Sequence, residues 1–518
     1  MNPISSHRLV IKDAARQLIG RIISALFWFL TIKIITPYLG PLQYGDYSTI
    51  LKYFAIWTAL ADLWLYVLAV KRLWAIKEQE KDPNHTELKS EYWKFVGTRL
   101  IIMSVIYVVA IIVAYLLPAY TSNPYLVRGL PFGMIFSASF MYAGIQQLPL
   151  QIFWRMDKLS RSLIVARLSQ IAILVPVVFF IFKDMTFDGS TVSLIAFCCI
   201  MFSVVASSIW QNVQIHISAN KLLKLKIKFD RTFTKNIIRR NWQYGVSYYL
   251  SSFHTLLVLL FLWRFFPTSS GHSYAWIRAL ALSLIEILLI IPSSLWNSLL
   301  HKISNYSLLN KRKSIGNLLL LIFRIGGVLA INFWLFADKV ILLVSDKSFI
   351  GSFASLSSRW SNQVLSFLGI MLVASFIKQV YNYLFVSVDK QNILLPINLI
   401  GICIGVPLWI WMIPQYGLLG GVITQLTIEL MFMIWAIFVG KRKHIQPVFS
   451  WNIRWKILII LASMSAVGYT ITHVWNLSML RFFIVAIPLN LIVLYISLPL
   501  IKKIAKWLTV EDAMHPEL

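Results

Sequence analysis

The sequence predicts an all-α membrane protein that crosses the bilayer many times. The chain has 518 residues, of which 58% are hydrophobic and only 13% charged, and its mean hydropathy is +0.72. Soluble domains carry about 25% charged residues. A nucleic-acid-binding protein could share the excess of 48 lysines and arginines over 20 acids, but it would be polar, and this chain is apolar.

Fourteen stretches are long and apolar enough to be spans, since a bilayer core needs about 20 helical residues. No small-residue cleavage site follows the first of them, so we expect it to be a retained span and not a signal peptide. The stretches lie near residues 17–37, 46–70, 95–117, 129–152, 162–182, 190–212, 242–263, 273–298, 316–337, 361–387, 392–413, 416–440, 457–475 and 480–501.

The distribution of positive charge supports this count. If the N-terminus is cytoplasmic, 33 of the 48 lysines and arginines fall in cytoplasmic segments, 7 on the opposite side and 8 within spans. One missing or extra span would invert every later loop and remove this asymmetry. We therefore expect fourteen spans with both termini in the cytoplasm.

The chain contains signs of an internal repeat. The segment FWRMDK at 153–158 precedes the fifth span, and FVSVDK at 385–390 precedes the eleventh, an offset of 232 residues. A second match, at a similar offset, pairs GDYS at 45–48 with HSYA at 272–275. Because each copy would hold six spans, an even number, the two lobes are expected to be related by a pseudo-two-fold axis along the membrane normal.

This repeat divides the chain into four parts. Residues 1–220 form a first lobe with spans one to six, and residues 242–441 form a second lobe with spans seven to twelve. The basic segment 221–241 joins them, and we expect it to be an amphipathic helix on the anionic leaflet, with partner binding as the alternative. Residues 442–518 supply spans thirteen and fourteen and a cytoplasmic tail.

Ionisable side chains inside the spans are the candidates for function. A charge near the bilayer centre costs about 2.5–3.5 kcal/mol even on lenient scales, so each must face water, pair with an opposite charge or extend to the membrane surface. The eight cations and three acids are Arg21, Lys33, Lys52, Arg99, Arg167, Arg278, Arg324, Lys378, Asp62, Glu286 and Glu429.

Position within the span separates these cations. Arg99 and Arg167 lie about one turn from the expected cytoplasmic ends and are expected to snorkel to the surface, as Arg21 also could. Lys52 and Arg278 lie at matching depths in the second and eighth spans, where they either line a cavity or snorkel.

The deeper charges have a structural interpretation. Arg324 and Lys378 lie near mid-span and are expected to be structural or secondary cavity cations, paired with an acid such as Glu429. Asp62 and Glu286 are either counter-ions or carboxylates that couple transport to an ion, as Glu429 could also be.

Other chemistry has little support in the sequence. His254 in the seventh span is either an interior histidine with its hydrogen bonds satisfied or a proton relay. The three cysteines lie in apolar runs and predict neither a disulfide framework nor a zinc site. No paired carboxylates, phosphate loop or metal-ligand spacing is present, so we expect no catalytic residues, no metal and no cofactor.

Three segments resemble a known family. They are TPYLGPLQYGDYSTI at 36–50, the ALADLWL run that contains Asp62, and residues 386–427, with their Ile-Pro-Gln-Tyr-Gly turn at 413–417. Together with the number and order of spans, they resemble the polysaccharide-transport branch of the multidrug/oligosaccharidyl-lipid/polysaccharide (MOP) flippase superfamily.

The resemblance implies a two-lobed transporter that moves polyprenyl-diphosphate-linked oligosaccharides across the bacterial inner membrane by alternating access. The substrates would be repeat units of the O-antigen of lipopolysaccharide, of capsule or of similar glycans. In that superfamily spans one, two, seven and eight line the cavity, which implies substrate-binding roles for Arg21, Lys33, Lys52 and Arg278. Related lipid II flippases have arginine in the second span, where this chain has Lys52. A proton gradient, a sodium gradient or the membrane potential would drive turnover. The bilayer, and a glycan polymerase or other export machinery, would be partners.

Three alternatives remain open. A lipid II flippase of peptidoglycan synthesis would have similar cations. A drug or cation antiporter of the same superfamily would favour an acidic cavity, whereas the spans here hold eight cations and three acids. A membrane glycan polymerase or ligase would need acid, base or cationic clusters on a large outer loop, and the outer loops are short.

Overall fold

The computed structural model describes residues 3–62, 65–80, 82, 84–265, 280–289, 308–345, 358–388 and 390–443. This described part is helical with no strand, which confirms the all-α fold class. Within it, 8 helices are long and apolar enough to cross a membrane. The expected spans thirteen and fourteen lie outside the described residues.

The chain separates into two compact units. One consists mainly of Asp13–Leu260 and is called the N-terminal unit, and the other consists mainly of Leu280–Leu518 and is called the C-terminal unit. The lobe and linker boundaries that the sequence suggests stay predictions.

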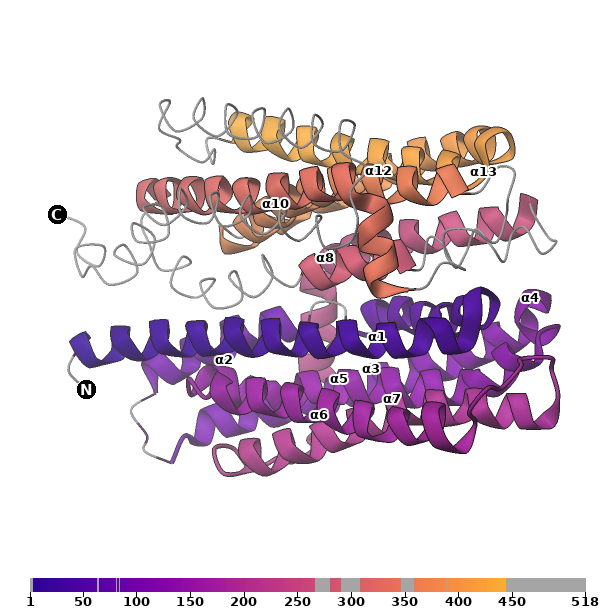
Figure 1. Ribbon diagram of the computed structural model, residues 1–518. Coiled ribbons are helices and arrows are strands. Elements are labelled where there is room, and N and C mark those ends of the chain that lie inside the picture. The colour runs from indigo at the N-terminus through magenta and orange to yellow at the C-terminus, as the bar shows by residue number, and fades with distance from the viewer. Residues whose placement is uncertain are drawn as a thin grey trace. The chain divides into compact units, whose positions relative to one another are not determined.

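The first expected span and most of the second form a single long element, α1 (Pro3–Asp62), that turns sharply at Gly40 (Figure 1). Gly40 has φ 68° and ψ 176°, a conformation that glycine adopts at low cost. Pro41 follows at the start of the next helical arm, where its missing N–H costs nothing. This turn falls between the first two expected spans, 17–37 and 46–70, and residues 44–47 after it are helical and buried.

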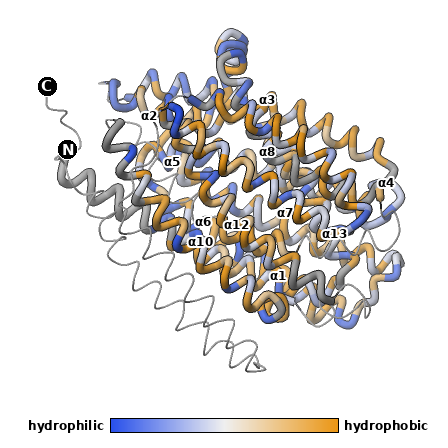
Figure 2. Tube along the Cα trace, turned by 90° about the horizontal axis from the view of Figure 1, so that it is seen from above, coloured by the Kyte–Doolittle hydropathy of each residue, from blue (hydrophilic) through white to orange (hydrophobic). Residues whose placement is uncertain are grey.

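The rest of the N-terminal unit is a bundle of helices packed side by side (Figure 1). α5 packs against α7, α6 against α7, and α3 against α2 and α5. Figure 2 shows apolar residues along α3 and α7 and hydrophilic residues gathered near α2. The elements are α2 (Leu65–Gln79), α3 (Thr86–Leu116), α4 (Pro118–Thr121), α5 (Pro124–Ile152), α6 (Met156–Pro176) with a π-helical turn at Val177–Ile181, and α7 (Thr191–Asn220).

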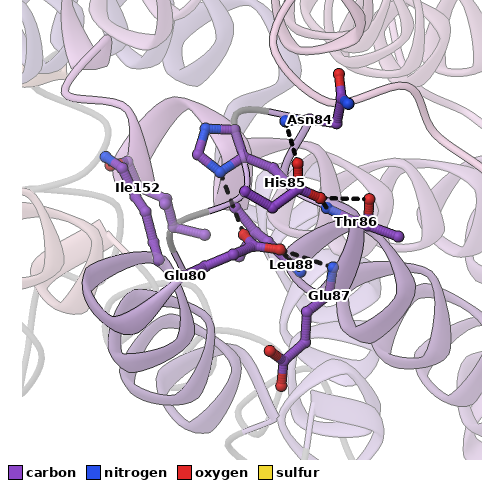
Figure 3. Close-up of polar contacts among 9 residues, drawn as sticks. Glu80, Asn84, His85, Thr86, Glu87, Leu88 and Ile152 are labelled. Atoms are coloured by element: carbon purple, nitrogen blue, oxygen red, sulfur yellow. Dashed lines mark hydrogen bonds and ion pairs between the residues drawn. The ribbon is translucent and has the colours of Figure 1, made fainter.

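Two carboxylates hold the turn before α3 (Figure 3). Glu80 Oε1 accepts the backbone N–H groups of Glu87 at 2.7 Å and Leu88 at 3.3 Å, donors that have no partner inside the helix. Asp82 Oδ2 accepts the hydroxyl of Thr86 at 2.6 Å. The hydrogen bond from Thr86 is the main reason that the pKa of Asp82 lies below its usual value. The turn therefore fixes where α3 begins.

The linker expected at 221–241 is helical only from residue 231 on. Residues 224–230 have no regular secondary structure and contact α3, and we call this segment the strap. Trp93 Nε1 donates to the Lys224 carbonyl at 2.9 Å, and the Lys228 N–H donates to the Trp93 carbonyl at 3.3 Å. Backbone hydrogen bonds to a neighbouring helix replace those a helical linker would make with itself.

A new helix, α8 (Arg231–Phe265), starts where the strap ends and continues into the seventh expected span. Asp230 accepts the Phe233 N–H through Oδ1 at 3.0 Å, and this bond lowers the pKa of the Asp230 carboxyl. Asp230 also lies 3.8 Å from Lys94 Nζ of α3. The start of α8 is therefore tied to the N-terminal unit, to which α8 belongs as far as Leu260.

The C-terminal unit contains long helices with one sharp turn. α12 packs against α10 and α13. Gly417, in the motif at 413–417, has φ 54° and ψ −132° and divides α13 into the expected spans eleven and twelve. The described elements are Leu280–Leu289, α10 (Leu308–Val344), α12 (Ser358–Ser387), a 3₁₀ turn at Gln391–Ile393 and α13 (Leu394–Arg442).

The repeat is present in the backbone, but at a different register. After α5, the N–H of Arg155 donates to Leu150 O at 2.7 Å, and after α12 the N–H of Lys390 donates to Phe385 O at 2.8 Å. Two further hydrogen bonds on each side match at the same offset of 235 residues. They join Phe153 to Pro149 and Lys158 to Arg155, and Val388 to Leu384 and Ile393 to Lys390. At this turn the backbone hydrogen bonds therefore match at an offset three residues larger than the 232 that the Asp-Lys pairs suggested.

Candidate functional site: charges within the spans

The first arm of α1 has one face on the bundle and one face exposed. Gly20 packs so closely on α6 that a Cβ there would lie 2.3 Å from Ser160 Cβ. Further along, the Arg167 guanidinium of α6 lies over the ring of Trp28, 5.7 Å from its centroid. The opposite stripe repeats every three or four residues and is exposed: Ile19, Ile22, Leu26, Leu30 and Lys33.

Lys33 is the charged member of this exposed stripe. It lies seven residues before Gly40, about 10 Å from the end of the arm at 1.5 Å per residue. In the described part of the chain it has no hydrogen-bond or ion-pair partner. An unpaired cation at this depth is stable only if water or an anion reaches it.

Arg21 and Lys52, the other cations of α1, are both half-buried. The second arm is anchored beside Lys52, where the buried Tyr53 hydroxyl donates to the Ala110 carbonyl of α3 at 2.6 Å. The structure thus places three of the four expected substrate-binding cations on one element, α1. The fourth, Arg278, lies outside the described residues, and the side chain of His254 on α8 does so as well.

Sequence reasoning missed the role of Arg99. It was expected to snorkel, but it is buried at 6% exposure and its guanidinium lies 2.6 Å from Asp62 Oδ1. It also lies over the ring of Tyr66, 5.8 Å from the centroid, and donates toward Met141 Sδ at 3.6 Å. The polar run before Arg99 could have revealed this burial, because it extends α3 back to Thr86 and places Arg99 thirteen residues inside the helix.

Arg167 is also held within the bundle instead of reaching the surface. Its guanidinium donates to Gln170 Oε1 at 2.9 Å on the same helix, in addition to its stacking on Trp28. α6 begins at Met156, so Arg167 lies eleven residues inside it and not one turn from its end. The expectation of snorkelling overlooked this earlier helix start.

The C-terminal unit contains a second buried ion pair. Lys378 Nζ of α12 lies 2.8 Å from Glu429 Oε1 of α13 and 4.8 Å from the centroid of the Phe432 ring. Glu429 is 5% exposed, so the pairing expected for Lys378 is present. Arg324 on α10 and Glu286 on the helix Leu280–Leu289 are half-buried.

These contacts show which of the expected acidic site residues are paired with a cation. Asp62 and Glu429 are each neutralised by a cation of their own unit, Arg99 and Lys378. Within the described residues, no group of three or more histidine, cysteine, aspartate or glutamate side chains could hold a metal ion.

The sequence of residues 10–301 matches the family model described as "Polysaccharide biosynthesis protein". The chain belongs to this family. Comparison with curated protein sequences finds no match.

Solved transporter structures share the fold. The lipid II flippase MurJ in an inward closed conformation is similar with a TM-score of 0.61 and 13% identity, over 95% of this chain and 100% of that chain. The Vibrio cholerae MATE transporter VcmN, as a mutant, gives 0.57 and 12%, over 86% and 98%. A multidrug resistance MATE transporter of the MOP superfamily, facing outward, gives 0.57 and 13%, over 84% and 97%.

The family and the fold together fix the class of protein. The chain is a polytopic membrane protein with the two-lobed all-helical fold of the MOP transporters. The solved structures that share this fold are MATE transporters and a lipid II flippase.

Proposed function

We propose that this chain is a flippase that moves polyprenyl-diphosphate-linked oligosaccharide units across the bacterial inner membrane, with both termini in the cytoplasm. The observation that carries the proposal is Lys33, an exposed cation without a partner among the described residues, on an otherwise apolar stripe of a membrane-spanning helix. A diphosphate headgroup that passes this stripe would supply the missing anion.

The chemistry of α1 suits such a headgroup. The lysines present compact ammonium charges to phosphate oxygens, and Arg21 presents a guanidinium that can bind two oxygens at once. Arg278 would add a cation from the second repeat. The family name supports a glycan as the cargo, and polymerases or other export machinery would act on the product.

The ion pairs bear on how transport is driven. Asp62 and Glu429 each have a close cationic partner, which favours counter-ion roles for both. Glu286, half-buried on its helix, stays a candidate either for a counter-ion or for coupling to protons or sodium. No cofactor is needed, because a gradient or the membrane potential can supply the free energy.

The test is export of surface glycan from cells in which the chromosomal gene is deleted and variants are supplied on a plasmid. Lys33→Gln should abolish export at normal protein abundance, Lys33→Arg should retain it, and the exposed control Lys235→Gln should match wild type. Arg278→Ala should also abolish export. Wild-type export from Lys33→Gln would remove Lys33 from the site. Normal surface glycan together with defective peptidoglycan in the deletion strain would instead favour a lipid II flippase.

A further inference from the structure

A groove of about 1050 Å³ lies within the N-terminal unit, between α3, α5 and α7. This volume is at the upper end of the range for small-ligand sites, about 300–1,000 Å³. Its rim is apolar and exposed: Val108 is 59% exposed, Ile112 53%, Ile135 41% and Ile217 55%. Exposed aliphatic side chains on three membrane-spanning helices suit contact with a hydrocarbon chain.

The floor of the groove is polar, which a hydrocarbon chain alone does not explain. Gln146 and Asn212 line it and are 1% and 8% exposed. Asn212 Nδ2 donates to the Ser139 carbonyl at 2.8 Å, but its Oδ1 has no hydrogen-bond partner in the described part of the chain. One terminal atom of the Gln146 amide likewise has none among the described residues. Buried polar atoms of this kind normally have partners.

Hydrogen bonding around His216 shows what Gln146 offers to the groove. Asn220 Oδ1 accepts the Leu225 N–H at 2.9 Å, so its Nδ2 donates to His216 Nε2 at 2.7 Å. A neutral imidazole then has its proton on Nδ1, which lies 2.9 Å from the Gln146 amide nitrogen Nε2. Because an amide nitrogen cannot accept this proton, the Gln146 amide must be turned by 180° so that Oε1 accepts it. The carbonyl oxygen of Gln146 is thereby occupied, and its amide N–H groups face the groove.

Positive charge lies next to this polar floor. Asn220, which binds His216, is followed at once by Lys221 and then by the strap, and both Lys221 and Lys224 are exposed. The strap alternates lysines with apolar residues, and its Ile227 and Phe229 are 68% and 51% exposed. Such a segment is typical of the interface between hydrocarbon and headgroups, where lysines attract anionic lipids.

We propose that this groove binds one anionic phospholipid of the leaflet on the strap's side. One acyl chain occupies the space between α3, α5 and α7, and the phosphate binds Lys221 and Lys224. The ester carbonyl oxygens of the glycerol region accept from the Gln146 amide. Gln146 lies six residues before the end of α5, about 9 Å along the helix, at the depth where ester groups follow a headgroup. A polyprenyl tail has no polar atoms for this floor.

The test uses the full-length purified protein and native mass spectrometry in detergent with an equal mixture of palmitoyl-oleoyl phosphatidylglycerol and phosphatidylcholine. Wild type should retain one phosphatidylglycerol. Ala138→Trp, which fills the groove, should lose it, and Ile135→Trp on the rim is a second filler if Ala138→Trp does not fold. Lys221→Gln with Lys224→Gln should weaken retention about thirtyfold, because two cations near the headgroup are lost.

The matched control removes the same charge from α8, as Lys235→Gln with Arg239→Gln, and should bind like wild type. Equal retention of phosphatidylcholine, or unchanged binding in both folded fillers, would overturn the proposal. Displacement of phosphatidylglycerol by undecaprenyl phosphate in wild type would overturn it too, because the groove would then belong to an isoprenoid. None of these outcomes depends on glycan export, so the lipid site and the proposed function can fail separately.

Discussion

The ion pair between Arg99 and Asp62 should make a measurable contribution to the stability of the N-terminal unit. Its two side chains differ in exposure, at 7% for Arg99 and 23% for Asp62. Removing one member of a buried pair costs about 3–5 kcal/mol, mainly because the other charge is left without compensation. The cost should therefore depend on which member remains.

Asp62→Asn leaves the more buried charge unpaired and should cost about 3–4 kcal/mol of unfolding free energy. Arg99→Met leaves the more exposed carboxylate, which water can partly solvate, and should cost less, about 2 kcal/mol. The double variant Asp62→Leu with Arg99→Met has no unpaired charge and should lie within about 1 kcal/mol of wild type.

Denaturation in mixed micelles of SDS, followed by tryptophan fluorescence, measures these differences. The exposed Arg128→Met is the control and should change stability by no more than about 0.5 kcal/mol. If the double variant is as unstable as the sum of the single variants, the two side chains do not interact energetically. That result would refute a structural role for the pair.

Other consequences concern the strap, the second ion pair and the turn before α3. Gly97→Val should displace the strap, because a Cβ at Gly97 would lie 2.3 Å from the Lys228 carbonyl oxygen. Trypsin should then cut after the strap lysines several times faster than in wild type, and an unchanged rate of cleavage would contradict this. Lys378→Met should destabilise the protein more than Lys378→Met with Glu429→Leu, as compared by thermal unfolding in detergent. The pKa of Asp82 is depressed in the folded protein, so its contribution to stability is complete above the unfolded pKa of about 3.8 and is lost as pH falls below it. The hydrogen-exchange rate of the first turn of α3, corrected for intrinsic rates, should therefore stay constant from about pH 7 to 5 and rise below about pH 4. Asp82→Asn should not show this rise.

Hydropathy and charge were sufficient to predict the class of fold. Apolar stretches of span length predict helices because lipid leaves backbone groups no other partner, and the described helices agree with this expectation. Turn positions were predicted to within a few residues. Gly417 turns the chain inside its motif, and Gly40 turns it between the first two expected spans. The polar Gly45-Asp46 pair after this turn lies inside a helix, where Asn123 Nδ2 donates to Asp46 at 2.9 Å.

Contacts between helices were harder to foresee. Arg99 was assigned to the surface because hydropathy places the start of its span at residue 95, whereas two capping carboxylates start the helix at Thr86. The strap could not be predicted either. Its lysines suit an amphipathic helix, and only its tight fit against Gly97 of α3 accounts for its lack of helical structure. Lys378 and Glu429 lie 51 residues apart, and their pairing could be expected because each would otherwise be an isolated charge.

Translocation in proteoliposomes tests the proposed transport most directly. Purified protein is reconstituted with fluorescent undecaprenyl-diphosphate-linked oligosaccharide, and movement between leaflets is followed by quenching from outside. Wild type should move this lipid, Lys33→Gln should not, and Lys235→Gln should match wild type. Equal rates for wild type, Lys33→Gln and protein-free liposomes would contradict a flippase that uses the cations of α1.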